Sequence, residues 1–496
     1  MQLMVGSRVA LTPRPVRRRD AVLETAMLGH CPGRVRLERL LALPDALDEM
    51  RTNGFGQRVD AVTQGRDADL YHLPIPLYAN AEFSDIFPDA HRGETRYESV
   101  LAGKNAWLAQ AVEDYFANGG EKLWIVRIPQ SQSHEGFLPA GGRALHDAAS
   151  LRGLATVLVI PSVGAIAFPD LERLQVPARL PDIPRNRLEN PDPRFMPCGT
   201  ELEDGHRERR YPAEIPDAAQ PPHFGELLPR ILDLVARHRP DLACLFTLPL
   251  AYSGSLGRPV ADNGALAWID AVRGSGNRQK LRLVQFLFPY LRGPRFGLRS
   301  PVGLVAGLQA GVARRAGPWR SMAGRPMVTD ALPYPRFSRA RMLKLREDPG
   351  VGVLQVRNGR VSLDDERLSV PALHPDETAG ASDLKRFDGF RSAEVQRLLG
   401  YLRRQLQALG ESLVFNLDYR DPRPRFALEQ FFRRLHAGGA LRGALPQDAF
   451  RITENHTREG AMIYEIMVAP AFPIDRLYLT FSNLNGAWQA SVAGSA

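Results

Sequence analysis

Two short patterns in the sequence contain residue types that could supply a nucleophile. Cys31 directly follows His30, and an imidazole beside a thiol can generate a reactive thiolate. Because adjacent residues on a strand point to opposite faces, we interpret the pair as a buried thiol and an unrelated histidine. Ser253 and Ser255 flank a glycine but lack the outer glycines of a nucleophile elbow. The sequence therefore predicts no catalytic residue, and a hydrolase-like enzyme acting through Ser253 or Ser255 is kept as an alternative.

Three further patterns could hold a ligand. The consecutive acids Asp364, Asp365 and Glu366 lack the alternate spacing of a calcium loop, so they are predicted to form a solvated turn. Trp107 and Tyr115, with Phe116, could stack on nucleic-acid bases, but their helical spacing predicts core positions. No complete phosphate-binding or dinucleotide-binding glycine loop occurs. We therefore expect no cofactor and no metal.

The cysteines indicate a reducing compartment. Only Cys31, Cys198 and Cys244 occur, with no CxxC pair and no histidine nearby at zinc-ligand spacing. The N-terminal residues lack the apolar core of a signal peptide. The longest apolar run, residues 154–168, is interrupted by Pro161 and is shorter than the roughly 20 residues of a membrane span. These features predict cytoplasmic synthesis without membrane insertion.

The chain has an ordinary globular composition. It has 496 residues, of which 44% are hydrophobic and 24% charged, and this length predicts about three domains. The 64 Lys+Arg exceed the 55 Asp+Glu and give a net charge of +9. Nearly all the basic residues are arginines spread along the whole chain, so we expect an evenly charged surface and no nucleic-acid partner. An arginine-rich polyanion-binding protein is the second alternative.

The strongest local prediction is a helix followed by a strand. Residues 104–118 place Trp107, Val112 and Tyr115 on one helical stripe, and Gly119 and Gly120 follow as a stop signal. The apolar run 122–128 then predicts a strand.

Strands alternating with helices are predicted in the middle of the chain. We expect a strand at 156–160, a helix at 224–238 and a strand at 243–248, and the alternation continues to residue 288. Such alternation predicts a mostly parallel sheet covered on both faces. Residues 177–222 hold ten of the chain's 40 prolines and are interpreted as a surface insertion.

The last region is predicted to be α+β. An amphipathic helix begins near residue 391, carries Leu398, Leu402 and Leu406, and ends at Gly410. A strand at 413–417 and a second helix ending at 438–439 come next. Three strands are expected at 449–453, 462–468 and 476–481.

Four segments carry a family resemblance. They are WLAQAVEDYFANGGEKLWIVRI at 107–128, SPVGLVAGLQA at 300–310, the run 397–451, and the closing VAPAFPIDRLYLTF at 468–481. In order and spacing they resemble contractile tail sheath proteins, over roughly residues 80–483.

The resemblance implies an α/β and α+β multidomain fold. A subtilisin-like α/β domain without a protease triad (140–345, with the insertion 177–222) would interrupt a core made from both chain ends (21–135 and 386–496). Residues 346–385 would form a linker, and residues 1–20 an extended N-terminal arm. Terminal segments would add strands to neighbouring subunits. The candidate exchange residues are Val9, Leu11, Ile463, Ile466, Leu477 and Leu479.

The function implied by the resemblance is structural rather than enzymatic. The chain would polymerise with copies of itself around an inner tube and contract to drive that tube through a target cell envelope. Baseplate and tail terminator proteins would be further partners, and the assembled particle would be a phage tail or a contractile injection system. Four arginines on the two C-terminal helices are candidates to face the tube: Arg403, Arg404, Arg433 and Arg434.

Overall fold

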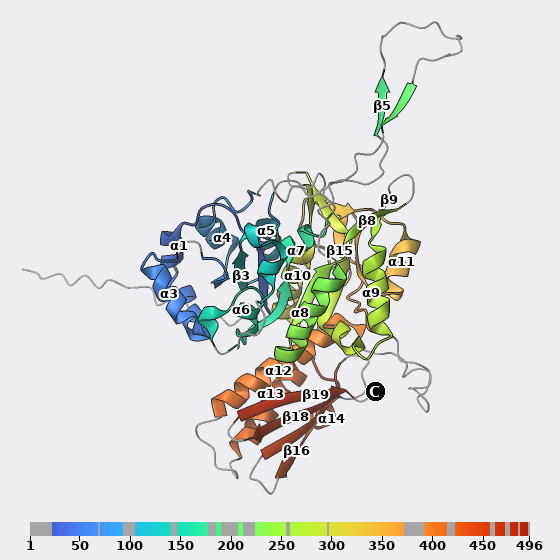
Figure 1. Cartoon of the computed structure of the whole chain (residues 1–496). Coiled ribbons are helices and arrows are strands. Elements are labelled where there is room, and N and C mark those ends of the chain that lie inside the picture. Colours follow the sequence, from blue (N-terminus) through green and yellow to red (C-terminus); the bar gives the residue numbers. More distant parts are fainter. Residues whose placement is uncertain are drawn as a thin grey trace, which may run out of the picture.

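The computed structural model shows a large body and a smaller C-terminal domain below it (Figure 1). It describes residues 22–67, 70–92, 105–139, 145, 147–176, 185–189, 207–211, 224–253, 258–294, 297–371, 391–413, 422–456, 462–471, 477–484 and 487–494.

An eight-stranded sheet forms the centre of the body. Its strand order is β15-β14-β10-β7-β4-β1-β3-β2. The inner pairs are parallel, whereas β2 and β15 pair antiparallel at the two edges. The strands are β1 (Glu24–His30), β2 (Pro74–Leu77), β3 (Leu123–Ile128), β4 (Val163–Ala167), β7 (Ala243–Thr247), β10 (Val284–Phe288), β14 (Gly352–Arg357) and β15 (Arg360–Leu363).

The strands at the middle of this sheet are buried along their length. Every residue of β1, β3, β4 and β10 is buried. Parallel strands covered on both faces need apolar residues on both faces, which explains runs such as LWIVRI in β3.

Helices surround the sheet, and most are short. In the body they are α1 (Leu37–Leu41), α2 (Pro44–Met50), α3 (Gly56–Thr63), α4 (Asn80–Ile86), α5 (Leu108–Ala117), α6 (Ala155–Leu158), α7 (Pro169–Arg173), α8 (Phe224–His238), α9 (Asn263–Arg273), α10 (Val302–Ala316) and α11 (Arg339–Glu347). A π-helical turn η1 (Arg51–Phe55) and the 3-10 turns η3 (Gln130–Phe137), η4 (Ala148–Ser150) and η5 (Arg278–Leu283) complete the set.

Helices α5 and α10 approach each other at backbone distance. A Cβ atom added to Gly307 of α10 would lie 2.2 Å from the Tyr115 carbonyl oxygen, and one on Gly303 would lie 2.4 Å from the Ala111 carbonyl oxygen. The glycines of the sequence SPVGLVAGLQA therefore allow this helix pair to pack within the core.

The C-terminal domain is a two-layer unit with its own core. Helices α12 (Ala393–Leu413) and α13 (Arg423–Ala437), with the short α14 (Pro446–Ala449), accompany an antiparallel sheet in the order β16-β17-β18-β19. The strands are β16 (Phe450–His456), β17 (Met462–Val468), β18 (Leu477–Leu484) and β19 (Ala487–Gly494). The body contributes Trp319 to this second core.

Three small antiparallel groups lie outside these two sheets: β5 (Arg185–Glu189) with β6 (Arg207–Tyr211), β8 (Leu250–Ser253) with β9 (Arg258–Ala261), and β11 (Tyr290–Gly293) between β12 (Gly297–Arg299) and β13 (Leu332–Tyr334). The β5–β6 hairpin projects from the body (Figure 1). It is the described part of the predicted insertion 177–222.

Several sequence predictions are confirmed. The mixed α/β and α+β architecture is present, α5 is followed by β3, and α8 occupies residues 224–238 as expected. Asn118 closes α5 and Gly119 has a φ of +101°, in agreement with the predicted glycine stop. The helix ending at 437 and the last three predicted strands are also found, together with the additional strand β19.

Other local predictions are wrong. Residues 155–158 form a helical turn, and the strand comes later as β4, because periodicity cannot distinguish strand from helix in a short run buried on all sides. Helix α12 continues past Gly410 to Leu413. The rest of the strand predicted at 413–417 lies outside the described residues.

The chain also divides differently from the predicted domains. Strand β1 pairs in parallel with both β3 and β4, so residues 21–135 join the α/β sheet instead of sharing a core with the C-terminal domain. The supposed linker 346–385 contains β14 and β15, which extend the same sheet at its edge. Long-range strand pairing decides both points, and sequence periodicity does not report it.

Candidate functional site

The strongest constellation of charged residues lies at the joint between the body and the C-terminal domain. Helix α12 forms this joint because two of its faces make contacts. Leu398, Leu402 and Leu406 enter the C-terminal core, while Arg397 and Arg404 contact the body.

The first contact is a buried ion pair. Arg397 donates from Nη1 to Glu366 Oε1 at 2.6 Å and from Nη2 to Oε2 at 3.0 Å. Their side chains are 2% and 0% exposed. Arg397 also donates to the carbonyl oxygens of Pro318 and Arg320, so one side chain connects α12 to two segments of the body. A planar guanidinium suits this role because it bonds a carboxylate with two parallel hydrogen bonds.

Glu366 receives further donors from the body. Its oxygens accept hydrogen bonds from Gln309 Nε2 at 3.1 Å, Ser321 Oγ at 2.9 Å and the Met322 N–H at 2.7 Å. Burial alone would raise the pKa of Glu366, but the charge of Arg397 and these hydrogen bonds hold it below its ordinary value. The carboxylate therefore remains ionised, and the predicted solvated turn at residues 364–366 is wrong for Glu366.

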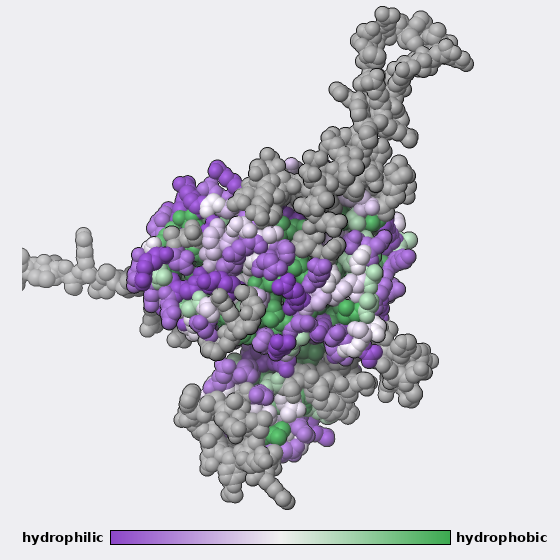
Figure 2. Space-filling view, in the orientation of Figure 1, coloured by the Kyte–Doolittle hydropathy of each residue, from purple (hydrophilic) through white to green (hydrophobic). Residues whose placement is uncertain are grey.

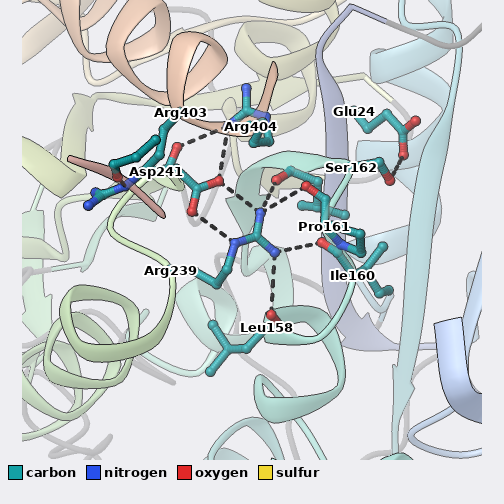
Figure 3. Close-up of polar contacts among 11 residues, drawn as sticks. Glu24, Leu158, Ile160, Pro161, Ser162, Arg239, Asp241, Arg403 and Arg404 are labelled. Atoms are coloured by element: carbon teal, nitrogen blue, oxygen red, sulfur yellow. Dashed lines mark hydrogen bonds and ion pairs between the residues drawn. The ribbon is translucent and has the colours of Figure 1, made fainter. Parts of the chain in front are cut away.

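The second contact centres on Arg239 and Asp241, between α8 and β7 (Figure 3). Arg239 donates to both carboxylate oxygens of Asp241 at 2.8 Å. It also donates to the carbonyl oxygens of Ile160 at 2.6 Å and Val163 at 2.8 Å. These hydrogen bonds satisfy backbone carbonyl groups in the turn that leads into β4.

Helix α12 reaches this second contact through Arg404. Its Nη1 donates to the backbone oxygen of Asp241 at 3.0 Å and to Oδ2 at 3.3 Å. Gly400, one turn earlier, permits the approach, since a Cβ there would lie 2.3 Å from the same backbone oxygen. Burial raises the pKa of Asp241, but its bonds with Arg239 and the charge of Arg404 lower it overall.

An open groove of about 790 Å³ follows the joint. Its wall includes Lys122, which bonds Glu24 Oε1 at 2.9 Å and also bonds Glu49. Ser162 donates to the other oxygen of Glu24 at 2.6 Å (Figure 3). These groups are bonded to one another, so this wall connects parts of the chain and does not offer open ligand positions.

The residues predicted to face a tube fall into two groups. Arg404 is held in the joint, and Arg403 donates from Nε to the Ala490 carbonyl oxygen at 3.1 Å. Arg433 and Arg434 lie on α13 and are exposed.

The predicted exchange residues lie mostly inside the C-terminal sheet. Ile463 and Ile466 are in β17, and Leu477 and Leu479 are in β18, both of which have intrachain partners on each side. Val9 and Leu11 are outside the described residues.

The candidate chemical groups are placed in the core. His30 and Cys31 are buried, and burial raises the pKa of the Cys31 thiol to about 12, which keeps it protonated. Trp107 and Tyr115 are core residues, as predicted. Ser253 ends β8, and Ser255 lies outside the described residues.

The described residues hold no group of three or more acidic, histidine or cysteine side chains placed to bind a metal. No helix among them is long and apolar enough to cross a bilayer. Figure 2 shows hydrophilic residues over much of the described surface, with small hydrophobic patches between them.

Sequence reasoning missed the joint. Glu366 and Arg397 are 31 positions apart, and Asp241 and Arg404 are 163 apart. The available signal was the stripe of Arg397, Gly400 and Arg404 at three- and four-residue spacing on α12, a second face beside its leucines.

Comparisons with known proteins identify the fold. No family model matches the sequence, and no curated protein matches it. Among solved structures, a chain of the anti-feeding prophage baseplate in its contracted state is similar, with a TM-score of 0.57 and 13% identity, covering 95% of this chain and 96% of that chain. A chain of the anti-feeding prophage helical sheath in its contracted state has a TM-score of 0.50 and 13% identity, covering 95% and 97%. The resemblance to contractile sheath proteins is thus confirmed at the level of the fold.

Proposed function

We propose that this chain is a subunit of a contractile sheath, which polymerises around an inner tube and contracts to drive the tube through a target cell envelope. The observation that supports this proposal is the similarity to the anti-feeding prophage sheath and baseplate chains. In each comparison the similarity covers nearly the whole of this chain and of the matched chain. Contraction requires two packings of the same subunits, with the contracted one lower in free energy and a barrier between them.

The joint supports this role physically. A subunit that transmits force needs rigid contacts between its domains. The joint supplies one buried bidentate ion pair and one arginine–aspartate cluster. Several arginines of the basic surplus are engaged within the chain in this way, including Arg239, Arg397 and Arg404. This use of arginine favours neither the polyanion-binding nor the hydrolase alternative.

The proposed partners are further copies of this chain, an inner tube protein, and baseplate and tail terminator proteins. Assembly would take place in the cytoplasm before the particle is released or fired. Arg433 and Arg434 are the candidates to contact an acidic tube surface, because both are exposed on one helix of the C-terminal domain. Arg403 and Arg404 are engaged in hydrogen bonds within the chain.

Electron microscopy of the purified protein, alone and with the products of neighbouring genes, tests the proposal. We expect tubular polymers of regular diameter. A protein that stays dispersed with all these partners, and that binds DNA or hydrolyses an ester instead, would overturn it.

The tube contact is tested by charge reversal. Arg433→Glu with Arg434→Glu should abolish co-assembly with the tube protein. The matched control is Arg357→Glu with Arg360→Glu, two exposed arginines on the β14–β15 hairpin of the body, which applies the same charge change elsewhere. If both double variants co-assemble with the tube protein to the same extent as each other, Arg433 and Arg434 do not contact the tube.

A further inference from the structure

Helices of opposite charge lie at the two ends of the eight-stranded sheet. Helices α2 and α4 pack on the edge strand β2, and helix α11 packs on β14 at the other end. Helices α4 and α11 are on opposite sides of the body in Figure 1. Strands β2 and β14 are six strand spacings apart, which is roughly 30 Å at about 4.8 Å for each spacing. No side chain crosses that distance, so a contact between these helices has to join two copies of the chain.

Helix α11 and the residues just before it present a basic face. Its four exposed cations are Arg336, Arg339, Arg341 and Lys344. No acidic residue occurs between positions 331 and 346, and Glu347, which follows this stretch, is bonded to Arg346 at 2.7 Å. Leu343 is 36% exposed on the same helix and adds apolar area to the face. These four cations and Leu343 are called the α11 face.

Helices α2 and α4 present an acidic face that Tyr78 holds together. The Tyr78 hydroxyl donates to Glu49 Oε2 at 2.8 Å, and the Tyr78 N–H donates to Glu82 Oε2 at 2.6 Å. Asp45 lies four positions before Glu49 on α2, so the two are neighbours on the helix surface. Asp85 lies three positions after Glu82 on α4, with the same consequence. Both aspartates are exposed, and neither helix contains a basic residue. These four acids are called the α2–α4 face.

The helix dipoles do not explain where these charges are placed. Arg339 and Arg341 are in the first turn of α11, although a helix N-terminus favours negative charge. Asp85 is in the last turn of α4, although a helix C-terminus favours positive charge. Charges that oppose the local preference on both faces indicate that they serve a contact outside their own helices.

We infer that the α11 face of one copy of this chain docks on the α2–α4 face of the next copy. The inference rests on the proposed sheath function and names the surfaces through which neighbouring subunits would meet. Because the two faces differ and lie at opposite ends of one sheet, each copy offers one face to each of two neighbours. Such head-to-tail contacts generate rings or open helical polymers.

Charge reversal in the purified protein tests this contact. Arg339→Glu with Arg341→Glu should leave α11 folded, because acidic residues are favoured in a first helical turn. Sedimentation velocity at low ionic strength should show association of wild-type copies. The double variant should associate at least about tenfold more weakly, because like charges would then face each other. Unchanged association of this variant, or a wild type that does not associate, would overturn the inference.

The complementary variant allows a rescue experiment. Asp45→Lys with Asp85→Lys makes the α2–α4 face basic, and alone this variant should associate as weakly as the first. In a mixture of the two variants, the acidic α11 face of one meets the basic α2–α4 face of the other. Association should then return to within about threefold of wild type. A mixture that associates no better than either variant alone would overturn the inference.

The matched control is Arg357→Glu with Arg360→Glu on the β14–β15 hairpin. It makes the same change in net charge at the same end of the sheet and should retain wild-type association. Loss of association in this control would show that net charge governs association instead of the α11 face, and would overturn the inference.

Electron microscopy separates failure of the contact from failure of the sheath function. If the wild type and the Arg339→Glu, Arg341→Glu variant form tubes equally, the contact is wrong and the sheath function stands. If the wild type forms no tubes with any partner, the sheath function is wrong, and sedimentation of the four proteins still decides the contact.

Discussion

Two places in this molecule bring a helix within backbone distance of its neighbour, and they are held by different forces. In the body, α10 packs on α5 through glycines, surrounded by apolar side chains such as Leu304 and Val112. At the joint, α12 packs on the body through Gly400, but the surrounding contacts are the Arg397–Glu366 pair and the Arg404–Asp241 pair.

The two kinds of contact differ in how strictly they fix the relative position of the helix and its neighbour. Apolar packing tolerates small shifts, because its energy is spread over many weak contacts. A buried ion pair with fixed hydrogen-bond geometry specifies one arrangement and strongly penalises the loss of either partner. The body is thus built for stability, and the joint fixes the orientation of the C-terminal domain. The following predictions challenge this comparison, from the largest expected effect to the smallest.

Removing one partner of the buried ion pair should have the largest effect. Arg397→Ala leaves the ionised Glu366 buried without its charge partner, and we expect a loss of about 3–5 kcal/mol in the free energy of unfolding, measured by urea denaturation. Arg346→Ala is the control, because its pairs with Glu347 and Asp364 are partly exposed and should contribute at most about 1 kcal/mol. A loss below about 1 kcal/mol for Arg397→Ala would contradict the comparison.

Adding one methyl group between α10 and α5 should have the next largest effect. Gly307→Ala would place a Cβ 2.2 Å from the Tyr115 carbonyl oxygen, so one helix must move, at a cost of about 1–3 kcal/mol. Gly276→Ala is the matched control, since a Cβ there meets no atom within 4 Å. Thermal unfolding of both variants measures the difference, and equal melting temperatures would show that the helices are not in close contact.

The same change at the joint should cost less. Gly400→Ala would place a Cβ 2.3 Å from the Asp241 carbonyl oxygen, but the neighbouring groove leaves room for α12 to move outward. We expect a loss of about 1 kcal/mol in urea denaturation, at the lower end of the overpacking range. A loss larger than that of Gly307→Ala would contradict this expectation and show that the ion pairs of the joint prevent α12 from moving.

The smallest effect concerns pH. Burial, and then the negative charge of Glu366, raise the pKa of Glu394 to about 7. The folded state therefore retains a proton that the unfolded state has released, and this stabilising contribution is present at low pH and is lost as pH rises through about 7. Because Glu394 is partly exposed, we expect Glu394→Gln to reduce the decline in unfolding free energy between roughly pH 5 and 8 by about 1 kcal/mol.

Glu347→Gln provides the control for this titration. Hydrogen bonding to Arg346 lowers the pKa of Glu347, so its contribution is lost only in acid, as pH falls through that lowered value. Urea denaturation across the same pH series should therefore leave the Glu347→Gln profile parallel to wild type. Parallel profiles for both variants would contradict the assigned environment of Glu394.

The local elements were largely predictable. Helix α5, strand β3 and helix α8 were predicted correctly. Their hydrophobic periodicity and their stop signals lie within segments of at most about 25 residues. Prediction failed where a short segment is buried on all sides, as at residues 155–158, because burial there depends on distant neighbours.

The sequence by itself determined the helix–strand unit at 104–128, helix α8, the C-terminal helices and the resemblance to contractile sheath proteins, since each depends on residues close together in the chain. Only the tertiary structure decided that β1 joins β3 and β4 in one sheet, and that Glu366 is a buried partner of Arg397 instead of part of a solvated turn. The physical reason is that strand pairing and charge burial are properties of residues brought together by folding, and each is specified by its partner as much as by its own sequence.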